Sequence, residues 1–287
     1  MLLNRFFGFL GIVLMLSSFS TAPAFADRHP VESLVSVAQQ QGVVRSSVIR
    51  VMALGDSITA GVGAYGSFSD DGGYRGSLAK LLVENGYHVT FVGSRSDFSV
   101  GVDAAHEGWP GYVLRSFPSD PGPGQLYGNL VRDAIEGGKP DLILLMAGTN
   151  DLLRLEKGDD GYTLGNIVQS MDLILDEIFQ QNPHVRVILA PVVSSPLIDI
   201  CTLAHFDGTD MVCGPMAVDN LANLVGKYSQ RGYQITLAGS MANAVPRDSA
   251  HFPDGIHPSG AGGYAAVANT WYQAISDVTD ESRRSVY

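Results

Sequence analysis

Residues Leu142–Ala147 read Leu-Ile-Leu-Leu-Met-Ala, an unbroken apolar run between Asp141 and Gly148. An apolar run without polar alternation is typical of a strand that is buried on both faces, as in a parallel sheet. Four further runs of similar character lie outward from this one along the chain. They are Val48–Leu54, His88–Gly93, Val185–Ala190 and the weaker Tyr233–Leu237.

The segments between these runs carry apolar residues at helical spacing. They are Leu78–Asn85, Leu130–Ile135, Ile167–Ile178, Leu221–Tyr228 and Gly260–Ile275. Glycine commonly ends a helix, so Gly86 and the pair Gly137-Gly138 are expected to stop the first two. The alternation predicts an α/β fold: a doubly wound three-layer α/β/α sandwich with a mostly parallel five-stranded sheet, in one domain over residues 47–287.

The N-terminal 26 residues are typical of a secretory signal peptide. Arg5 supplies a positive charge, Phe6–Leu16 is an apolar run too short for a comfortable membrane span, and Ala24-Phe25-Ala26 offers small residues for cleavage. We expect cleavage after Ala26 and a secreted or periplasmic protein without a membrane anchor; an uncleaved anchor is the alternative. Residues 27–46 are polar and Gln-rich and are interpreted as a lead-in to the domain.

Both cysteines, Cys201 and Cys213, lie beyond the signal peptide and near each other. In an exported protein such a pair is expected to form a disulfide. The alternatives are two free buried thiols and, less well supported, a catalytic cysteine.

Composition excludes several functional classes. A formal net charge of −11 would repel nucleic acid. The histidines are scattered without the helical spacing of a zinc site, and there is no phosphate-binding glycine loop with lysine and no dinucleotide fingerprint. We therefore expect no metal and no cofactor. The acidic turns Asp70-Asp71 and Asp159-Asp160 leave structural calcium open, with solvated loops as the alternative.

Three motifs follow predicted core elements. Gly55-Asp56-Ser57 comes after the first strand, Gly148-Thr149-Asn150-Asp151 after the third, and Asp254-Gly255-Ile256-His257 lies between Pro253 and Pro258. Active groups collect at the carboxyl ends of parallel strands. An Asp three residues before a His can orient the imidazole and leave its other nitrogen free as a base. Each motif alone could be a turn or a helix cap, but together they are much more specific.

The combination resembles the SGNH (GDSL-type) hydrolase family over roughly residues 48–275. The resemblance implies that Ser57 is the nucleophile, His257 the general base and acid, and Asp254 the orienting carboxylate. It also implies an oxyanion hole made by the Ser57 N–H, a glycine N–H and the Asn150 side chain. The glycine belongs to the block His106-Glu107-Gly108-Trp109-Pro110-Gly111; we favour Gly111, with Gly108 as the alternative.

Three further blocks resemble the secreted acetylxylan esterases of the third carbohydrate-esterase family. They are Gly73–Gly76, Phe91–Ser94 and His106–Gly108, whereas the stretch around Ser67–Gly72 and the loop Pro118–Gly124 depart from that pattern. The resemblance implies hydrolysis of short-chain esters, chiefly acetyl groups, on an acetylated carbohydrate such as xylan or on another small ester.

The alternatives to that activity are a general lipase or thioesterase of the same family and a non-catalytic secreted carbohydrate-binding module. Trp109 and Tyr65 are candidate aromatics for stacking on a sugar, with ordinary packing as the alternative. The oligomeric state is left open.

Overall fold

The computed structural model describes residues 48–69, 71–96, 105–118, 122–198 and 215–284. The chain divides into two units, Met1–Arg45 and Ser46–Tyr287, and every described residue belongs to the second. The proposed signal peptide, the whole lead-in and both cysteines lie outside the described residues. None of the helices in the described part of the chain is long and apolar enough to cross a membrane.

A parallel sheet forms the centre of the unit. Its strands are β1 (Ile49–Gly55), β2 (Val89–Phe91), β3 (Glu107–Gly108), β4 (Leu142–Met146), β5 (Arg186–Leu189) and β6 (Ile235–Leu237). The order is β2-β1-β4-β5-β6, and β3 pairs with the carboxyl end of β1. All of the pairings are parallel. Every residue of β4 is buried, as its uniform apolar sequence requires.

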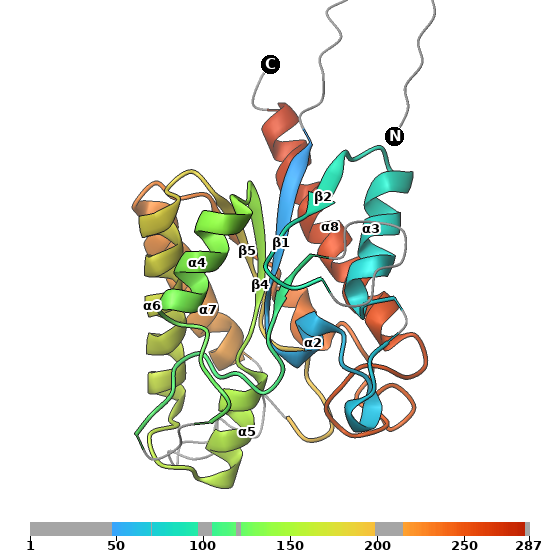
Figure 1. The fold of residues 1–287 in the computed structure, drawn as a ribbon, viewed down its shortest axis with the longest axis vertical. Coiled ribbons are helices and arrows are strands. Elements are labelled where there is room, and N and C mark those ends of the chain that lie inside the picture. Colours follow the sequence, from blue (N-terminus) through green and yellow to red (C-terminus); the bar gives the residue numbers. More distant parts are fainter. Residues whose placement is uncertain (1–47, 70, 97–104, 119–121, 199–214, 285–287) are drawn as a thin grey trace, which may run out of the picture. The chain divides into compact units, whose positions relative to one another are not determined.

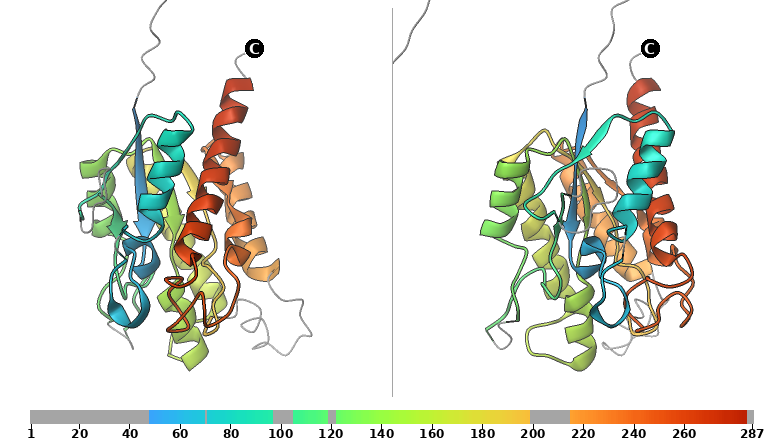
Figure 2. Two further views of the ribbon diagram at one scale, coloured as in Figure 1. Left: turned by 90° about the vertical axis from the view of Figure 1, so that its right-hand side faces the viewer. Right: turned by 45° about the vertical axis from the view of Figure 1, so that its right-hand side comes forward.

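Helices cover both faces of the sheet (Figure 1). On one face lie α4 (Asn129–Gly138), α6 (Leu164–Gln181) and α7 (Pro215–Gln230); on the other lie α3 (Tyr74–Glu84) and α8 (Gly263–Arg284). The turned views show α8 running beside α3 (Figure 2). Each helix packs its apolar stripe against the sheet, so two hydrophobic cores lie on either side of β1 and β4.

The predicted three-layer architecture is confirmed, and each of the five predicted strands is present. The sheet also contains the two-residue strand β3, which the sequence did not predict. The five predicted helices are present too, and α8 extends beyond its predicted end at Ile275 to Arg284. Two further helices, α2 (Ser57–Ala60) and α5 (Thr149–Lys157), begin within the motifs that the sequence placed after strands.

The prediction that Gly137-Gly138 stops a helix is confirmed, because α4 ends at Gly138. Both glycines belong to the last turn of α4, and the C-cap residue Lys139 adopts the left-handed conformation. A Cβ on Gly138 would stand 2.6 Å from the Met52 Cε, and the Gly138 carbonyl accepts hydrogen bonds from the Arg50 guanidinium. The end of α4 therefore lies against β1, where a Cβ on Gly138 would displace the flexible end of the Met52 side chain.

Candidate active site

Ser57 begins α2 directly after β1, at the carboxyl edge of the sheet. The preceding Asp56 caps this short helix by accepting the Ile58 N–H at 3.1 Å. At the other end, the buried Arg75 guanidinium donates to the carbonyls of Thr59 and Ala60 at 3.1 and 3.3 Å. These contacts fix the Ser57 backbone, although a helix this short would be unstable alone.

Three predicted residues form one chain of hydrogen bonds. The Ser57 Oγ lies 3.0 Å from the His257 Nε2, and the His257 Nδ1 lies 2.7 Å from the Asp254 Oδ2. Both His257 and Asp254 side chains are mostly buried. In this geometry the imidazole can take the Ser57 proton while Asp254 fixes its tautomer and stabilises the cation that results.

The loop that carries Asp254 and His257 is tied internally and to its surroundings. The Asp254 Oδ1 accepts the backbone N–H groups of Ile256 and His257 at 3.0 and 2.8 Å, and the Oδ2 also accepts the Tyr65 N–H at 3.3 Å. Burial opposes ionisation of Asp254, but the hydrogen bonds from His257 and Ile256 outweigh burial and lower its pKa. Asp254 therefore stays a carboxylate when His257 becomes protonated.

The structure separates the two candidate oxyanion glycines. The Gly108 N–H donates to the His106 Nδ1 at 2.9 Å, and a Cβ on Gly108 would stand 2.3 Å from the Ala60 nitrogen. Gly108 is thus needed because a side chain at this position would prevent the close packing of β3 against α2. Within the described residues, the N–H groups of Ser57 and Gly111 have no acceptor, so both are free to bind an oxyanion.

Asn150 lies in the first turn of α5, where Gly148 is the N-cap and no side chain caps the helix. The interpretation of Asn150 as a helix cap is therefore wrong. Instead, its Nδ2 donates to the Tyr112 carbonyl at 2.8 Å. That bond fixes the amide beside the segment that follows Gly111. The second Nδ2 hydrogen has no acceptor within the described part of the chain and remains available to a ligand.

Two buried carboxylates connect the motifs, and the sequence had not identified them as parts of the site. The Asp56 Oδ2 accepts the Thr149 N–H at 3.1 Å, which joins the start of α2 to the start of α5. The Asp151 carboxylate accepts the Leu114 N–H at 2.9 and 3.1 Å. Burial raises the pKa of Asp56, and it raises the pKa of Asp151 to about 7. In the sequence, the one feature that could have indicated these two aspartates is that each is a carboxylate within an otherwise apolar or glycine-rich motif.

Glu107 is a third buried carboxylate in this region. It accepts hydrogen bonds from the Ser94 N–H, from the Ser94 hydroxyl at 3.0 Å and from the Trp109 Nε1 at 3.0 Å. The Trp109 ring also contacts the Arg95 guanidinium at 4.8 Å and the Tyr112 ring at 5.1 Å. Trp109 is therefore packed in place, and the turn that contains Gly111 starts from a fixed residue.

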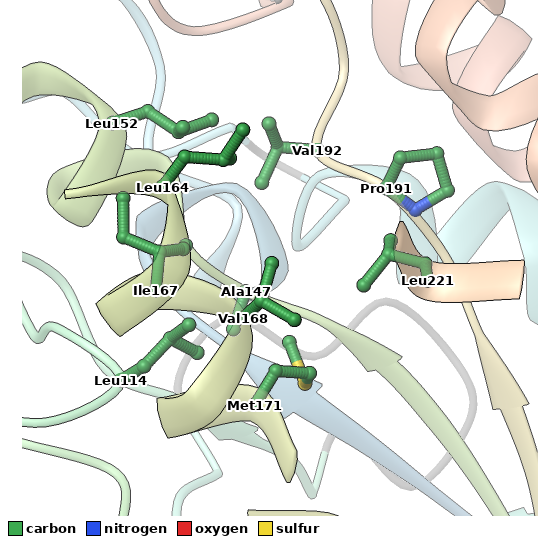
Figure 3. Close-up of a pocket in the computed structure, with 11 residues that line it drawn as sticks. Leu114, Ala147, Leu152, Leu164, Ile167, Val168, Met171, Pro191, Val192 and Leu221 are labelled. Atoms are coloured by element: carbon green, nitrogen blue, oxygen red, sulfur yellow. The ribbon is translucent and has the colours of Figure 1, made fainter. Parts of the chain in front are cut away.

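An apolar cavity of about 60 Å³ lies at the carboxyl ends of β4 and β5 (Figure 3). Side chains of α5, α6 and α7 surround it together with Val192, and Gly148 belongs to its wall. The cavity therefore offers apolar space close to the motif that contains Asn150.

The structure thus brings Ser57, Asp254 and His257 together and leaves the N–H groups of Ser57 and Gly111 and one Asn150 amide hydrogen available. Among the described residues, no group of three or more His, Cys, Asp and Glu side chains could hold a metal ion. The predicted disulfide between Cys201 and Cys213 lies outside the described residues and stays a prediction.

Residues 53–265 match the model of the GDSL-like lipase/acylhydrolase family. A relative described as a multidomain esterase, from Ruminococcus flavefaciens, is 29% identical over 255 residues. The matched region covers 80% of this chain but 29% of that relative, so the chain corresponds to under a third of its length.

Solved structures share the fold. A family 3 carbohydrate esterase from Clostridium thermocellum gives a TM-score of 0.57 at 23% identity and covers 80% of this chain and 96% of its own. A family 3 carbohydrate esterase from Talaromyces cellulolyticus gives 0.61 at 21% identity, with 82% and 99% covered. At these identities the likeness shows the arrangement of sheet and helices.

Proposed function

The chain belongs to the GDSL-like lipase/acylhydrolase family and is a carboxylic ester hydrolase, and we propose that it acts as a serine esterase through Ser57, His257 and Asp254. The observation that carries the proposal is the continuous hydrogen-bond chain from the Ser57 hydroxyl to the Asp254 carboxylate. A nucleophile, a base and an orienting group in that order are the requirement for an acyl-enzyme mechanism.

In the proposed reaction, His257 takes the Ser57 proton as the Oγ attacks the acyl carbon. The carbonyl oxygen becomes negative and accepts hydrogen bonds from the Ser57 N–H, the Gly111 N–H and the Asn150 Nδ2. Loss of one such donor typically costs about 3–4 kcal/mol of barrier. His257 then protonates the leaving alcohol, the acyl-enzyme forms, and water repeats the same steps to release the acid.

Gly111 is the proposed glycine donor because its N–H is free among the described residues, whereas that of Gly108 is bonded to His106. Asn150 is the proposed side-chain donor because its orientation is already fixed by the Tyr112 carbonyl. Donors that are positioned before the reaction need no reorganisation when charge develops.

The proposed substrate is a short-chain ester, chiefly acetyl, on a plant polysaccharide such as xylan. Support comes from the shared fold with family 3 carbohydrate esterases and from the sequence blocks Gly73–Gly76 and His106–Gly108. Arg75 and Glu107 from these blocks fix α2 and Trp109 in the site region. We also propose export, with cleavage after Ala26, on the strength of the N-terminal sequence.

A general lipase or thioesterase is the second candidate, and the apolar cavity beside Gly148 favours it. Rates on p-nitrophenyl esters from acetyl to decanoyl, measured beside acetate release from acetylated xylan, separate the candidates. A maximum at acetyl together with acetate release supports the proposal, whereas a maximum at long chains without acetate release supports the lipase.

Ser57→Ala tests the mechanism. It should lower kcat by several orders of magnitude with unchanged circular dichroism, because the nucleophile is lost while its neighbours remain. Near wild-type turnover in the folded variant would refute the assignment of Ser57.

A further inference from the structure

Tyr65 is the most exposed of the large hydrophobic residues that the structure describes, with 85% of its surface accessible. Its backbone is left-handed, with φ of 57° and ψ of 29°, inside the short helix η1 (Ala64–Gly66). A non-glycine residue occupies that region at a cost in energy and keeps it only when its surroundings enforce it. Here the Ala64 N–H donates to the Ser259 Oγ, and the Ser67 Oγ donates to the Ala64 carbonyl, each at 2.8 Å.

The Tyr65 side chain is fixed at both ends although its ring is exposed. Its backbone N–H donates to the Asp254 Oδ2 at 3.3 Å, and its hydroxyl donates to the Pro253 carbonyl at 3.0 Å. The turn around η1 therefore lies beside the loop that precedes α8, at the bottom of the view in Figure 1. A ring that is already oriented loses little conformational freedom when a ligand packs on it.

The Tyr65 ring lies beside the loop that carries Asp254 and His257. Tyr65 contacts the loop of His257, the residue that would protonate the leaving oxygen. Two of the three proposed oxyanion donors, Gly111 and Asn150, belong to the segments that follow β3 and β4, whereas the third, the Ser57 N–H, lies in α2. Gly111 and Asn150 therefore lie on other elements than Tyr65 and the His257 loop.

The other candidate aromatic does not fit this role. The Trp109 ring is occupied by the Arg95 guanidinium and by the Tyr112 ring, and its Nε1 is bonded to Glu107. Of the two aromatics, Tyr65 is the one whose ring is largely accessible to a ligand.

We propose that Tyr65 is a stacking platform for the sugar ring of the leaving alcohol, and so a specificity-determining residue; this inference rests on the proposed function. The C–H face of a pyranose is flat and apolar enough to pack on a phenol ring. An acyclic alcohol such as ethanol has no such face. Tyr65 therefore favours acetylated sugars over acyclic acetates by contact with the alcohol part of the substrate.

The test compares two acetate esters, a monoacetylated methyl β-xyloside and ethyl acetate, by their ratio of kcat/KM. Tyr65→Ala should lower the ratio about tenfold, mainly through a higher KM for the xyloside. Tyr65→Asn should do the same, and because Asn tolerates the left-handed conformation it keeps the turn. Tyr65→Phe retains the ring and should retain most of the ratio. Val83→Ala removes an exposed apolar side chain at the far end of α3 and should leave the ratio unchanged.

The outcomes separate this inference from the proposed function. Hydrolysis of both esters by the wild type, with a ratio that Tyr65→Ala and Tyr65→Asn leave unchanged, would overturn the stacking role while the esterase stands. Equal losses on both esters would assign Tyr65 to support of the Asp254 loop and also overturn it. A wild type that hydrolyses ethyl acetate but no xyloside acetate would overturn the proposed substrate and the stacking role together.

Discussion

Replacement of Asn150 by alanine removes two hydrogen-bond donors that act at different times. One Nδ2 hydrogen is bonded to the Tyr112 carbonyl in the free protein, at 2.8 Å. The other is free among the described residues and is the proposed donor to the oxyanion. The first bond contributes to folding, whereas the second forms fully only when charge develops on the substrate.

The two losses have different magnitudes. Loss of the Tyr112 bond should lower the free energy of unfolding by about 1 kcal/mol, because Asn150 is only partly buried and water can replace the donor. In a domain of this size that corresponds to roughly 2–4 °C in Tm. Loss of the oxyanion donor should lower kcat by about 10²- to 10³-fold and leave KM nearly unchanged.

Steady-state kinetics on p-nitrophenyl acetate and thermal unfolding followed by circular dichroism measure both effects in one preparation. Asn166→Ala is the matched control, since the Asn166 Nδ2 also donates to a backbone carbonyl, that of Gly161, at 2.8 Å. It should reproduce the small loss of Tm without the loss of kcat. Asn150→Asp places an acceptor where the donor stood and should lower kcat at least as far as alanine does.

The reasoning fails if Asn150→Ala loses Tm as Asn166→Ala does and keeps its kcat. The Tyr112 bond would then be the whole contribution of Asn150. A proportional rise in KM with unchanged kcat would also refute it, because that result describes a contact made equally in the ground state and in the transition state.

Three further predictions follow from the site and its surroundings. The kcat/KM should fall as the pH is lowered, because protonated His257 cannot take the Ser57 proton; a flat profile from about pH 4 to about pH 8 would contradict a histidine base. Burial raises the pKa of Asp151 in the folded protein to about 7, above its usual value of 3.8. The free energy of unfolding should therefore fall as the pH rises from 3.8 to about 7, because the buried carboxyl loses its proton there. At pH 8, Asp151→Asn should therefore raise the urea midpoint above that of the wild type, which corresponds to a free energy of unfolding higher by up to roughly 4 kcal/mol. Near pH 4 the two midpoints should differ little, and an identical pH dependence in both proteins would refute this prediction. Cys201 and Cys213 should resist alkylation until they are reduced, as judged by intact mass; two modified thiols without reduction would exclude the disulfide.

Much of the fold could be predicted from the sequence because its strands are buried on both faces. Leu142–Ala147 has no polar residue, so a buried environment is expected, and its short length favours a strand. The strand β3 could not be predicted in the same way. Glu107 and Gly108 carry no strand pattern, and their place is set by pairing with Leu54 and Gly55 of β1. The C-cap of α4 could not be predicted from the glycines, because Lys139 and not a glycine adopts the left-handed conformation there.

The side chains that the candidate site brings together could be predicted as well, because each belongs to a short motif that the sequence singled out. The contacts that position them could not. Asp56 bonds to Thr149 and Asp151 to Leu114, and these partners are remote in the chain. The choice between Gly108 and Gly111 likewise depends on which N–H finds an acceptor, and His106 provides that acceptor for Gly108.

The short spacing of Asp254 and His257 has a consequence for heat inactivation. Asp254 and His257 share one loop that has its own internal hydrogen bonds. The loop can therefore detach from the rest of the protein and dock again without breaking the hydrogen bond between carboxylate and imidazole. Its bonds to the rest of the protein include those of Tyr65 to Asp254, Ala64 to Ser259 and Leu197 to Gly255. Surface segments of this kind open at lower free energy than a central sheet. On warming, we therefore expect the loop to open and the enzymatic activity to be lost reversibly at temperatures where β1 and β4 are still paired.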